Sequence, residues 1–139
     1  MVKYYNPNPT CKFFKSGKPK NWYINDSAIR AIAKVFDVTW ETAYDMLSKA
    51  GLSLHDIPVS KQAINFILNK NNFEFVTLGK PKKGSSRPLV KEFVESINAV
   101  DTYVLNLADY FVTVEDSKIY DVSDDCLKSS VYSYWVKKN

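Results

Sequence analysis

The apolar positions of this chain change their spacing once, and that change limits the class of fold the chain can adopt. From residue 26 to residue 70, apolar side chains recur at intervals of three and four residues, whereas from residue 73 onward they alternate or form short β-rich runs. Helices followed by strands predict an α+β fold, in which N-terminal helices pack on a C-terminal antiparallel β-sheet. The predicted helices cover 28–36, 39–50, 60–70 and 89–94, and the predicted strands cover 73–79, 100–107, 110–115, 118–122 and 131–136, with a turn at 116–117.

Residues typical of helix ends occur at the expected boundaries of the predicted helices. Asp26 or Ser27 is suited to cap the first helix, and Ser60 the third, because such side chains accept hydrogen bonds from the free amides of a first turn. Gly51 is predicted to end the second helix. Pro88 is predicted to stand at the first position of the fourth helix.

The first 24 residues are predicted to form an extended arm that packs on a single domain spanning 1–139. Prolines at 7, 9 and 19 disfavour a helix there, and lysines alternate with aromatic side chains. The chain has no apolar run near the roughly 18 residues of a membrane-spanning helix. Its N-terminus lacks the apolar stretch of a signal peptide, so we expect a cytoplasmic protein with no membrane partner.

The net charge of +4 is unevenly distributed along the chain. Residues 1–20 and 80–91 carry lysines or arginines and no acid, whereas acidic residues concentrate between 92 and 125. Such segregation favours a polar encounter surface for a partner, although basic loops can also be merely solvated. The candidate binding residues in the second basic segment are Lys80, Lys82, Lys83 and Arg87.

Few residue types suited to metals or redox chemistry are present. Two cysteines, Cys11 and Cys126, and one histidine, His55, make a poor zinc site, and no cofactor or metal is expected. Both cysteines are interpreted as free thiols, and a bridge between them under oxidising conditions stays open as an alternative. His55 precedes Asp56, but adjacent loop residues rarely aim at each other productively.

Seven short motifs occur in order along the chain: Tyr5-Asn6-Pro7-Asn8-Pro9, the run 25–32, Trp40-Glu41-Thr42-Ala43-Tyr44, Asp56-Ile57-Pro58, Thr102-Tyr103-Val104-Leu105, Lys118-Ile119-Tyr120-Asp121 and Tyr134-Trp135. In this order they resemble a known family, the small papain-like proteins of phages and Firmicutes prophages. These are distant relatives of the bacteriocin-processing cysteine peptidase domain, and the resemblance covers essentially the whole chain. It implies a papain-like fold and a phage-encoded protein that acts in the host cytoplasm.

This chain departs from the family at two of the three catalytic positions. Family members have a nucleophilic Cys where this chain has Ser27, and a Gly-His pair where it has Asp109-Tyr110. The Asp that orients the His is retained as Asp121. The loop that carries His55 lies far from the catalytic strand in this family.

Loss of both the thiol and the imidazole predicts an inactive protease. A serine hydroxyl needs a hydrogen-bonded general base to become nucleophilic, whereas a helix N-terminus and a neighbouring imidazolium can drive a thiol to its thiolate. Tyr110 is a poor replacement, because a phenol is protonated at neutral pH and is therefore a poor base. Asp121 is only a weakly basic carboxylate, and Ser27 is also suited to a purely structural place at a helix start.

Three functions follow as hypotheses from this reading. The first is a pseudo-protease that binds a host protein, for example as an inhibitor of a defence protein, through the basic loop together with Asp109 and Tyr110. The second is a serine-variant hydrolase that uses Ser27, with Asp109, Asp121 or a repositioned His55 as base. The third is nucleic-acid binding by the basic arm and loop 80–91, although arginine is scarce and no RNA-binding motif is present.

Overall fold

A six-stranded sheet divides the molecule into two layers of packing. The computed structural model describes residues 1–9 and 25–139, so most of the predicted arm, Cys11 included, lies outside the described residues. The strand order is β1-β5-β4-β3-β6-β2. The strands are β1 (Val2–Tyr4), β2 (Glu74–Thr77), β3 (Thr102–Asn106), β4 (Phe111–Glu115), β5 (Lys118–Asp121) and β6 (Ser133–Lys137). Each of the five predicted strands is present.

The sheet is mixed, which corrects two expectations. Residues 2–4, expected in an irregular arm, form the edge strand β1, and β1 pairs with β5 in parallel. The remaining strand pairs are antiparallel, as predicted. The expectation of an irregular arm rested on its prolines, which begin only at residue 7 and so leave residues 2–4 free to pair. A run of three residues is too short to show a strand pattern by itself.

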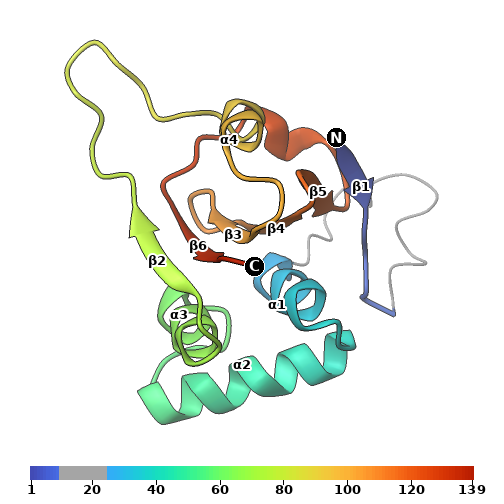
Figure 1. Ribbon diagram of the computed structural model, residues 1–139. Helices are drawn as coiled ribbons and strands as arrows, with labels where there is room; N and C mark the ends of the chain where they lie inside the picture. The colour runs from blue at the N-terminus through green and yellow to red at the C-terminus, as the bar shows by residue number, and fades with distance from the viewer. Residues whose placement is uncertain (10–24) are drawn as a thin grey trace, which may run out of the picture.

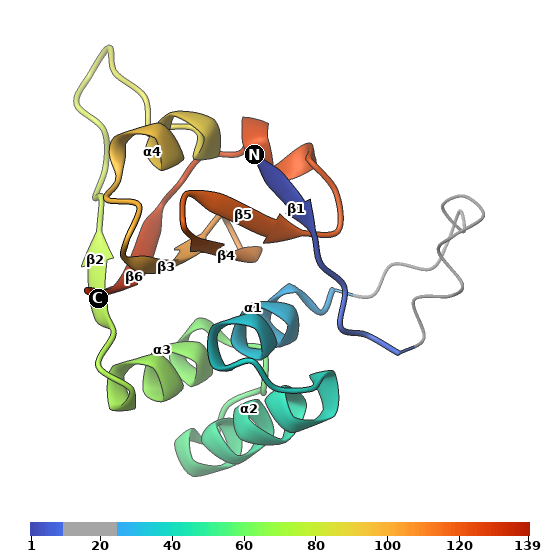
Figure 2. The same ribbon diagram turned by 45° about the vertical axis from the view of Figure 1, so that its right-hand side comes forward.

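The helices are α1 (Ser27–Phe36), α2 (Trp40–Leu54), α3 (Lys61–Lys70) and α4 (Val90–Ser96), with a 3₁₀ helix η2 (Asp125–Lys128) before β6. Four helices on a sheet confirm the predicted α+β class. Figures 1 and 2 show α1, α2 and α3 on one side of the sheet and α4 on the other.

The alternation of side chains along the strands explains this arrangement. Val104, Phe111 and Trp135 are buried in the core under α1 to α3, whereas Leu105 and Val112, one position along, are buried in a second core with α4 and η2. Because neighbouring residues of a strand point to opposite faces, a sheet covered on both sides needs apolar residues at nearly every central position. The central strands satisfy this requirement.

Of the predicted helix ends, those of α3 are confirmed, that of α1 is confirmed in position only, and those at Gly51 and Pro88 are wrong. Ser60 caps α3 through its hydroxyl, and α3 ends at Lys70. Asp26 is the N-cap residue of α1, but its side chain makes no capping hydrogen bond. Ser27 is the first helical residue. Gly51 lies inside α2, which continues to Leu54, because the Gly51 backbone packs against the loop that follows the helix. α4 begins at Val90 and not at Pro88.

Two-residue turns join β3 to β4 and β4 to β5. The predicted turn at Asp116-Ser117 is present, and both residues have positive φ. In the other hairpin Ala108 and Asp109 take φ values of 60° and 66°, and the Leu107 amide donates to the Tyr110 carbonyl at 2.7 Å. Such turns match the twist of the flanking strands, which is why they are favoured in hairpins. None of the helices within residues 1–9 and 25–139 has the length and apolar character needed to cross a membrane.

Candidate functional site

Ser27 lies at the start of α1, against the first residue of β4. Its side-chain oxygen accepts a hydrogen bond of 3.1 Å from the Phe111 amide, and its hydroxyl donates to Asn25 Oδ1 at 3.4 Å. Only 1% of Ser27 is exposed. The hydroxyl is therefore engaged in joining α1 to β4 and is shielded from solvent.

The buried guanidinium of Arg30, which follows Ser27 by three residues in α1, links two carboxylates. It forms an ion pair with Asp26, one helical turn earlier, and a second one with Asp121 at the end of β5, at 3.4 Å. Asp26 also accepts hydrogen bonds from Trp40 Nε1 at 3.0 Å and from Asn8 Nδ2 at 3.1 Å. We call Asp26, Arg30, Tyr110 and Asp121 the Arg30 network.

Tyr110 completes this network. Its hydroxyl accepts a hydrogen bond of 2.7 Å from Arg30 and donates one of 2.6 Å to Asp121 Oδ1. Asp121 also accepts a hydrogen bond from the Val122 amide at 2.7 Å. The structure therefore brings the neighbourhoods of Ser27, Tyr110 and Asp121 together, with Arg30 bonded to both Tyr110 and Asp121.

No base contacts Ser27 within residues 1–9 and 25–139. Its hydroxyl bonds there to an amide side chain and a backbone N–H, neither of which can take a proton at neutral pH. His55 is exposed at the C-cap of α2, the helix end that leads into α3, and not at the start of α1 (Figure 1). Nucleophilic catalysis by serine requires a base within hydrogen-bond reach, so the geometry does not favour hydrolysis.

Cys126 is a buried free thiol next to the same network. Burial, and after it the negative charge of Asp121 and a hydrogen bond to that carboxylate, raise the pKa of Cys126 to about 12. The thiol therefore stays protonated at neutral pH and has the low reactivity expected of a structural cysteine. Cys11, its alternative disulfide partner, lies outside the described residues.

Three of the predicted binding residues meet in one groove. Lys80, Arg87 and Asp109 line a polar hollow of about 370 Å³, which we call the basic-loop groove. Lys82 and Lys83 are exposed further along the loop and do not line it. Tyr110 belongs to the Arg30 network instead. The other lining residues used below are Lys61, Thr77, Tyr132 and Ser133.

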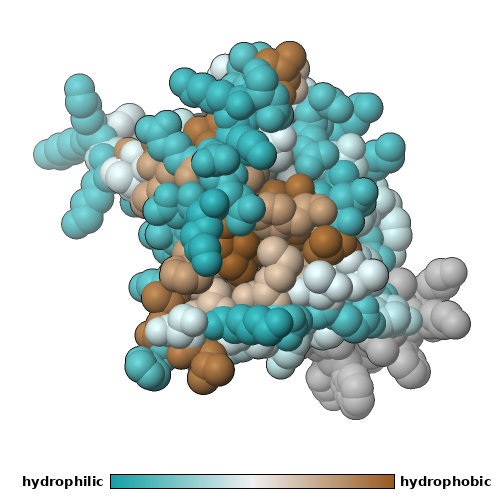
Figure 3. Space-filling view, turned by 60° about the horizontal axis from the view of Figure 1, so that its bottom comes forward, coloured by the Kyte–Doolittle hydropathy of each residue, from teal (hydrophilic) through white to brown (hydrophobic). Residues whose placement is uncertain are grey.

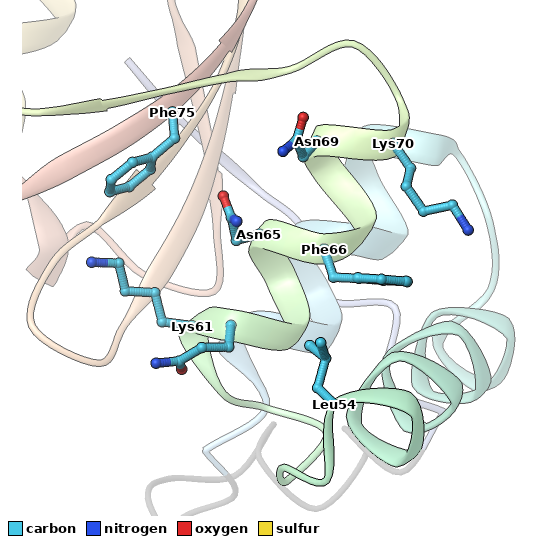
Figure 4. Close-up of a pocket in the computed structure, with 8 residues that line it drawn as sticks. Leu54, Lys61, Asn65, Phe66, Asn69, Lys70 and Phe75 are labelled. Carbon is cyan, nitrogen blue, oxygen red and sulfur yellow. The ribbon is translucent and has the colours of Figure 1, made fainter.

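A second hollow, of about 650 Å³, was missed by sequence reasoning. It lies along α3, and Figure 4 shows the Phe75 side chain of β2 facing the side of the helix that carries Lys61 and Asn65. Apolar side chains gather in and around a hollow on the helical side of the molecule (Figure 3). The available signal was Phe66, an aromatic residue outside the buried helical stripe formed by Ala63, Ile64, Ile67 and Leu68.

The described residues contain no group of three or more His, Cys, Asp or Glu arranged to hold a metal ion. Comparisons with protein-family models, with curated proteins and with solved structures find no match for this chain. The assignment of a function therefore depends on the residues themselves.

Proposed function

We propose that this chain is a catalytically inactive protein of papain-like descent that acts by binding a protein partner with an acidic surface. The observation that carries the proposal is the state of Ser27, which is buried and hydrogen-bonded to the Phe111 amide instead of to a base. The position that would hold the imidazole in the resembled family is occupied by Tyr110, whose hydroxyl is already bonded to Arg30 and Asp121.

The proposed contact surface is the loop between β2 and α4. Both of its ends are attached to the segment before β6, because the Leu78 amide donates to the Tyr132 carbonyl and the Val131 amide donates to the Pro88 carbonyl. The loop between these anchors protrudes from the body of the molecule (Figures 1 and 2). It therefore exposes Lys82 and Lys83 to solvent, whereas Lys80 and Arg87 line the basic-loop groove together with Asp109.

The composition of this surface suits a protein partner. Lys80, Lys82 and Lys83 are exposed, and the loop from 80 to 91 has no acid. At its base the apolar side chains of Leu78, Leu89 and Tyr132 are each more than one third exposed. An apolar centre with a charged surround is typical of protein interfaces, and the charge accelerates association.

The resemblance to phage proteins favours a partner made by the host cell. We propose a host protein met in the cytoplasm, such as a component of a defence system. Affinity capture from host lysate with the full chain, followed by purification of the captured protein, would supply the partner for kinetic measurement.

Charge reversal in the loop tests the proposed surface. Lys82→Glu/Lys83→Glu is expected to slow association with the purified partner at least about tenfold and to flatten its salt dependence, because charged surfaces steer encounter. Lys3→Glu/Lys138→Glu changes the net charge equally at exposed positions outside the loop and should leave association nearly unchanged. Equal association rates for the wild type and the loop variant would contradict the proposal.

The inactive site has its own test. A fluorophosphonate probe is expected to leave Ser27 unlabelled between pH 6 and pH 9, because the hydroxyl contacts no base within the described residues. Labelling of the wild type that disappears in Ser27→Ala would contradict inactivity and favour the serine-hydrolase alternative. A shift of a defined RNA or DNA at physiological salt would instead favour the nucleic-acid alternative.

A further inference from the structure

The basic-loop groove has the chemistry of a small-ligand site, separate from the exposed tip of the loop. We propose that it binds a small molecule that carries a phosphate monoester and an adjoining hydroxyl, such as a sugar phosphate. Three basic side chains, Lys61, Lys80 and Arg87, line the groove with a single carboxylate, that of Asp109. This excess of two positive charges matches the charge of a phosphate monoester near neutral pH.

The three cations are not neutralised by the protein. None of them belongs to an ion pair within the part of the chain that the structure describes. The Arg87 guanidinium carbon lies 4.4 Å from the centre of the Tyr132 ring, which holds the guanidinium in place. Its Nε is buried and has no acceptor within the described residues. A buried donor without an acceptor is unfavourable, so Arg87 is prepared for an anion that would supply one.

Two hydroxyl groups add neutral donors. Thr77 Oγ1 accepts a hydrogen bond of 3.3 Å from the Gly79 amide, and Ser133 Oγ accepts one of 3.0 Å from Asn106 Nδ2. Each hydroxyl therefore has its own proton left to donate into the groove. Ser133 is almost fully buried, so the position of its oxygen is set by β6 and its neighbours. Phosphate oxygens accept hydrogen bonds from both cationic and hydroxyl donors.

The remaining features limit the kind of ligand. The volume of about 370 Å³ lies at the lower end of small-molecule pockets, which excludes a large cofactor. Asp109 would repel a second anionic group but can accept a hydrogen bond from an alcohol. It lines the groove from a turn in which both Ala108 and Asp109 have positive φ. One phosphate with a nearby hydroxyl satisfies these conditions.

Titration of the ¹⁵N-labelled full chain with ribose 5-phosphate tests the proposal. The amides of Thr77, Asn106 and Ser133 are expected to shift with saturation, whereas ribose and succinate should bind at least about tenfold more weakly, because the first lacks the anion and the second lacks the phosphate geometry. No shift with ribose 5-phosphate up to millimolar concentrations, or equal binding of succinate, would overturn the proposal.

Matched variants connect the signal to the groove. Arg87→Gln is expected to weaken ribose 5-phosphate binding at least about tenfold, and Arg87→Lys to weaken it less, because lysine keeps the charge but not the planar donor pair. Asp109→Asn should strengthen the binding of inorganic phosphate, because it removes a repelling charge. Lys82→Gln, outside the groove, should bind ribose 5-phosphate like the wild type; a loss equal to that of Arg87→Gln would indicate non-specific attraction and overturn the assignment.

This inference does not rest on the proposed partner protein. The Lys82 and Lys83 reversals test the partner surface and leave the groove intact, whereas Arg87→Gln tests the groove. Failure of either experiment therefore leaves the other interpretable. A thermal unfolding curve of each variant, compared with the wild type, shows that the fold is retained.

Discussion

The Tyr110 hydroxyl donates a hydrogen bond of 2.6 Å to Asp121, and Arg30 donates to both residues. In the resembled family these two positions would hold a base and the carboxylate that orients it. In this chain the same positions are joined by a guanidinium and form a buried structural contact. Such networks are sensitive to the loss of one member, because each buried charge then lacks its partner.

Removal of the Arg30 guanidinium is expected to destabilise the protein strongly. Arg30→Met leaves Asp26 and Asp121 buried without their cation, and losses of about 3–5 kcal/mol are typical of a broken buried ion pair. Tyr110→Phe should cost less, about 1–2 kcal/mol, because it removes only hydrogen bonds. Urea unfolding followed by circular dichroism measures both values.

The exposed ion pair on α2 provides the control for that experiment. Lys49 contacts Asp45 at 2.8 Å, but both side chains are largely exposed. Lys49→Met should therefore change the free energy of unfolding by less than about 0.5 kcal/mol. Equal effects of Arg30→Met and Lys49→Met would show that the buried network contributes no more to the free energy of unfolding than an exposed ion pair does.

Gly51→Ala is expected to destabilise α2, although alanine is the better helix former. A Cβ at Gly51 would lie 2.7 Å from the Asp56 carbonyl oxygen and 3.2 Å from backbone atoms of Ile57. The helix gains about 1 kcal/mol from alanine propensity, but a clash with backbone costs about 1–3 kcal/mol, so we expect a net loss. Ser53→Ala, at an exposed position of α2, should not destabilise; unfolding midpoints of the two variants decide the comparison.

Ala108 is strained by its positive φ of 60°. This conformation costs most L-residues about 1–2 kcal/mol, and Asn and Asp adopt it more readily. Ala108→Asn is therefore expected to stabilise the protein by about 0.5–1 kcal/mol. Ala99→Gly provides a contrast, because exposed Ala99 has negative φ and glycine there only adds freedom to the unfolded chain. Opposite shifts in melting temperature are expected, and a drop for Ala108→Asn would argue against strain.

The stability of the protein is expected to fall as pH rises above about 9. The pKa of Cys126 is raised by burial to about 12 in the folded chain, against about 8.5 for a free thiol. Between these values the unfolded chain releases its proton while the folded chain keeps it, so unfolding becomes more favourable. Burial also raises the pKa of Tyr5 and Tyr103, which adds to the same trend.

Unfolding midpoints at pH 7, 9 and 10.5 under reducing conditions check this dependence. Cys126→Ala should lose less stability between pH 7 and pH 10.5 than the wild type, since it lacks the thiol contribution while both tyrosines remain. Identical pH slopes for the two proteins would show that the Cys126 thiol is not protected from ionisation.

Local patterns accounted for most of the secondary structure. The spacing of apolar residues predicts which face of a helix or strand is buried, as it does from Ile29 to Phe36 and around Val112. This spacing can be recognised from residues that are close together in the sequence. Part of the Arg30 network also had a local signal, because Asp26 and Arg30 are spaced as an i,i+4 ion pair. The end of α2 was mispredicted because Gly51 is required by a close approach from the following loop and not by a turn.

By itself the sequence determined the α+β class, the positions of the helices and most strands, and the absence of a thiol and an imidazole at positions 27 and 110, because each depends on residue type or short-range spacing. Only the tertiary structure decided the parallel pairing of Val2–Tyr4 with β5, the union of Arg30 with Asp121, and the meeting of Lys80, Arg87 and Asp109 in one groove. These contacts join segments between 22 and 117 residues apart in the sequence. Backbone pairing or charge pairing between such remote segments produces no repeating pattern of residues from which it could be predicted.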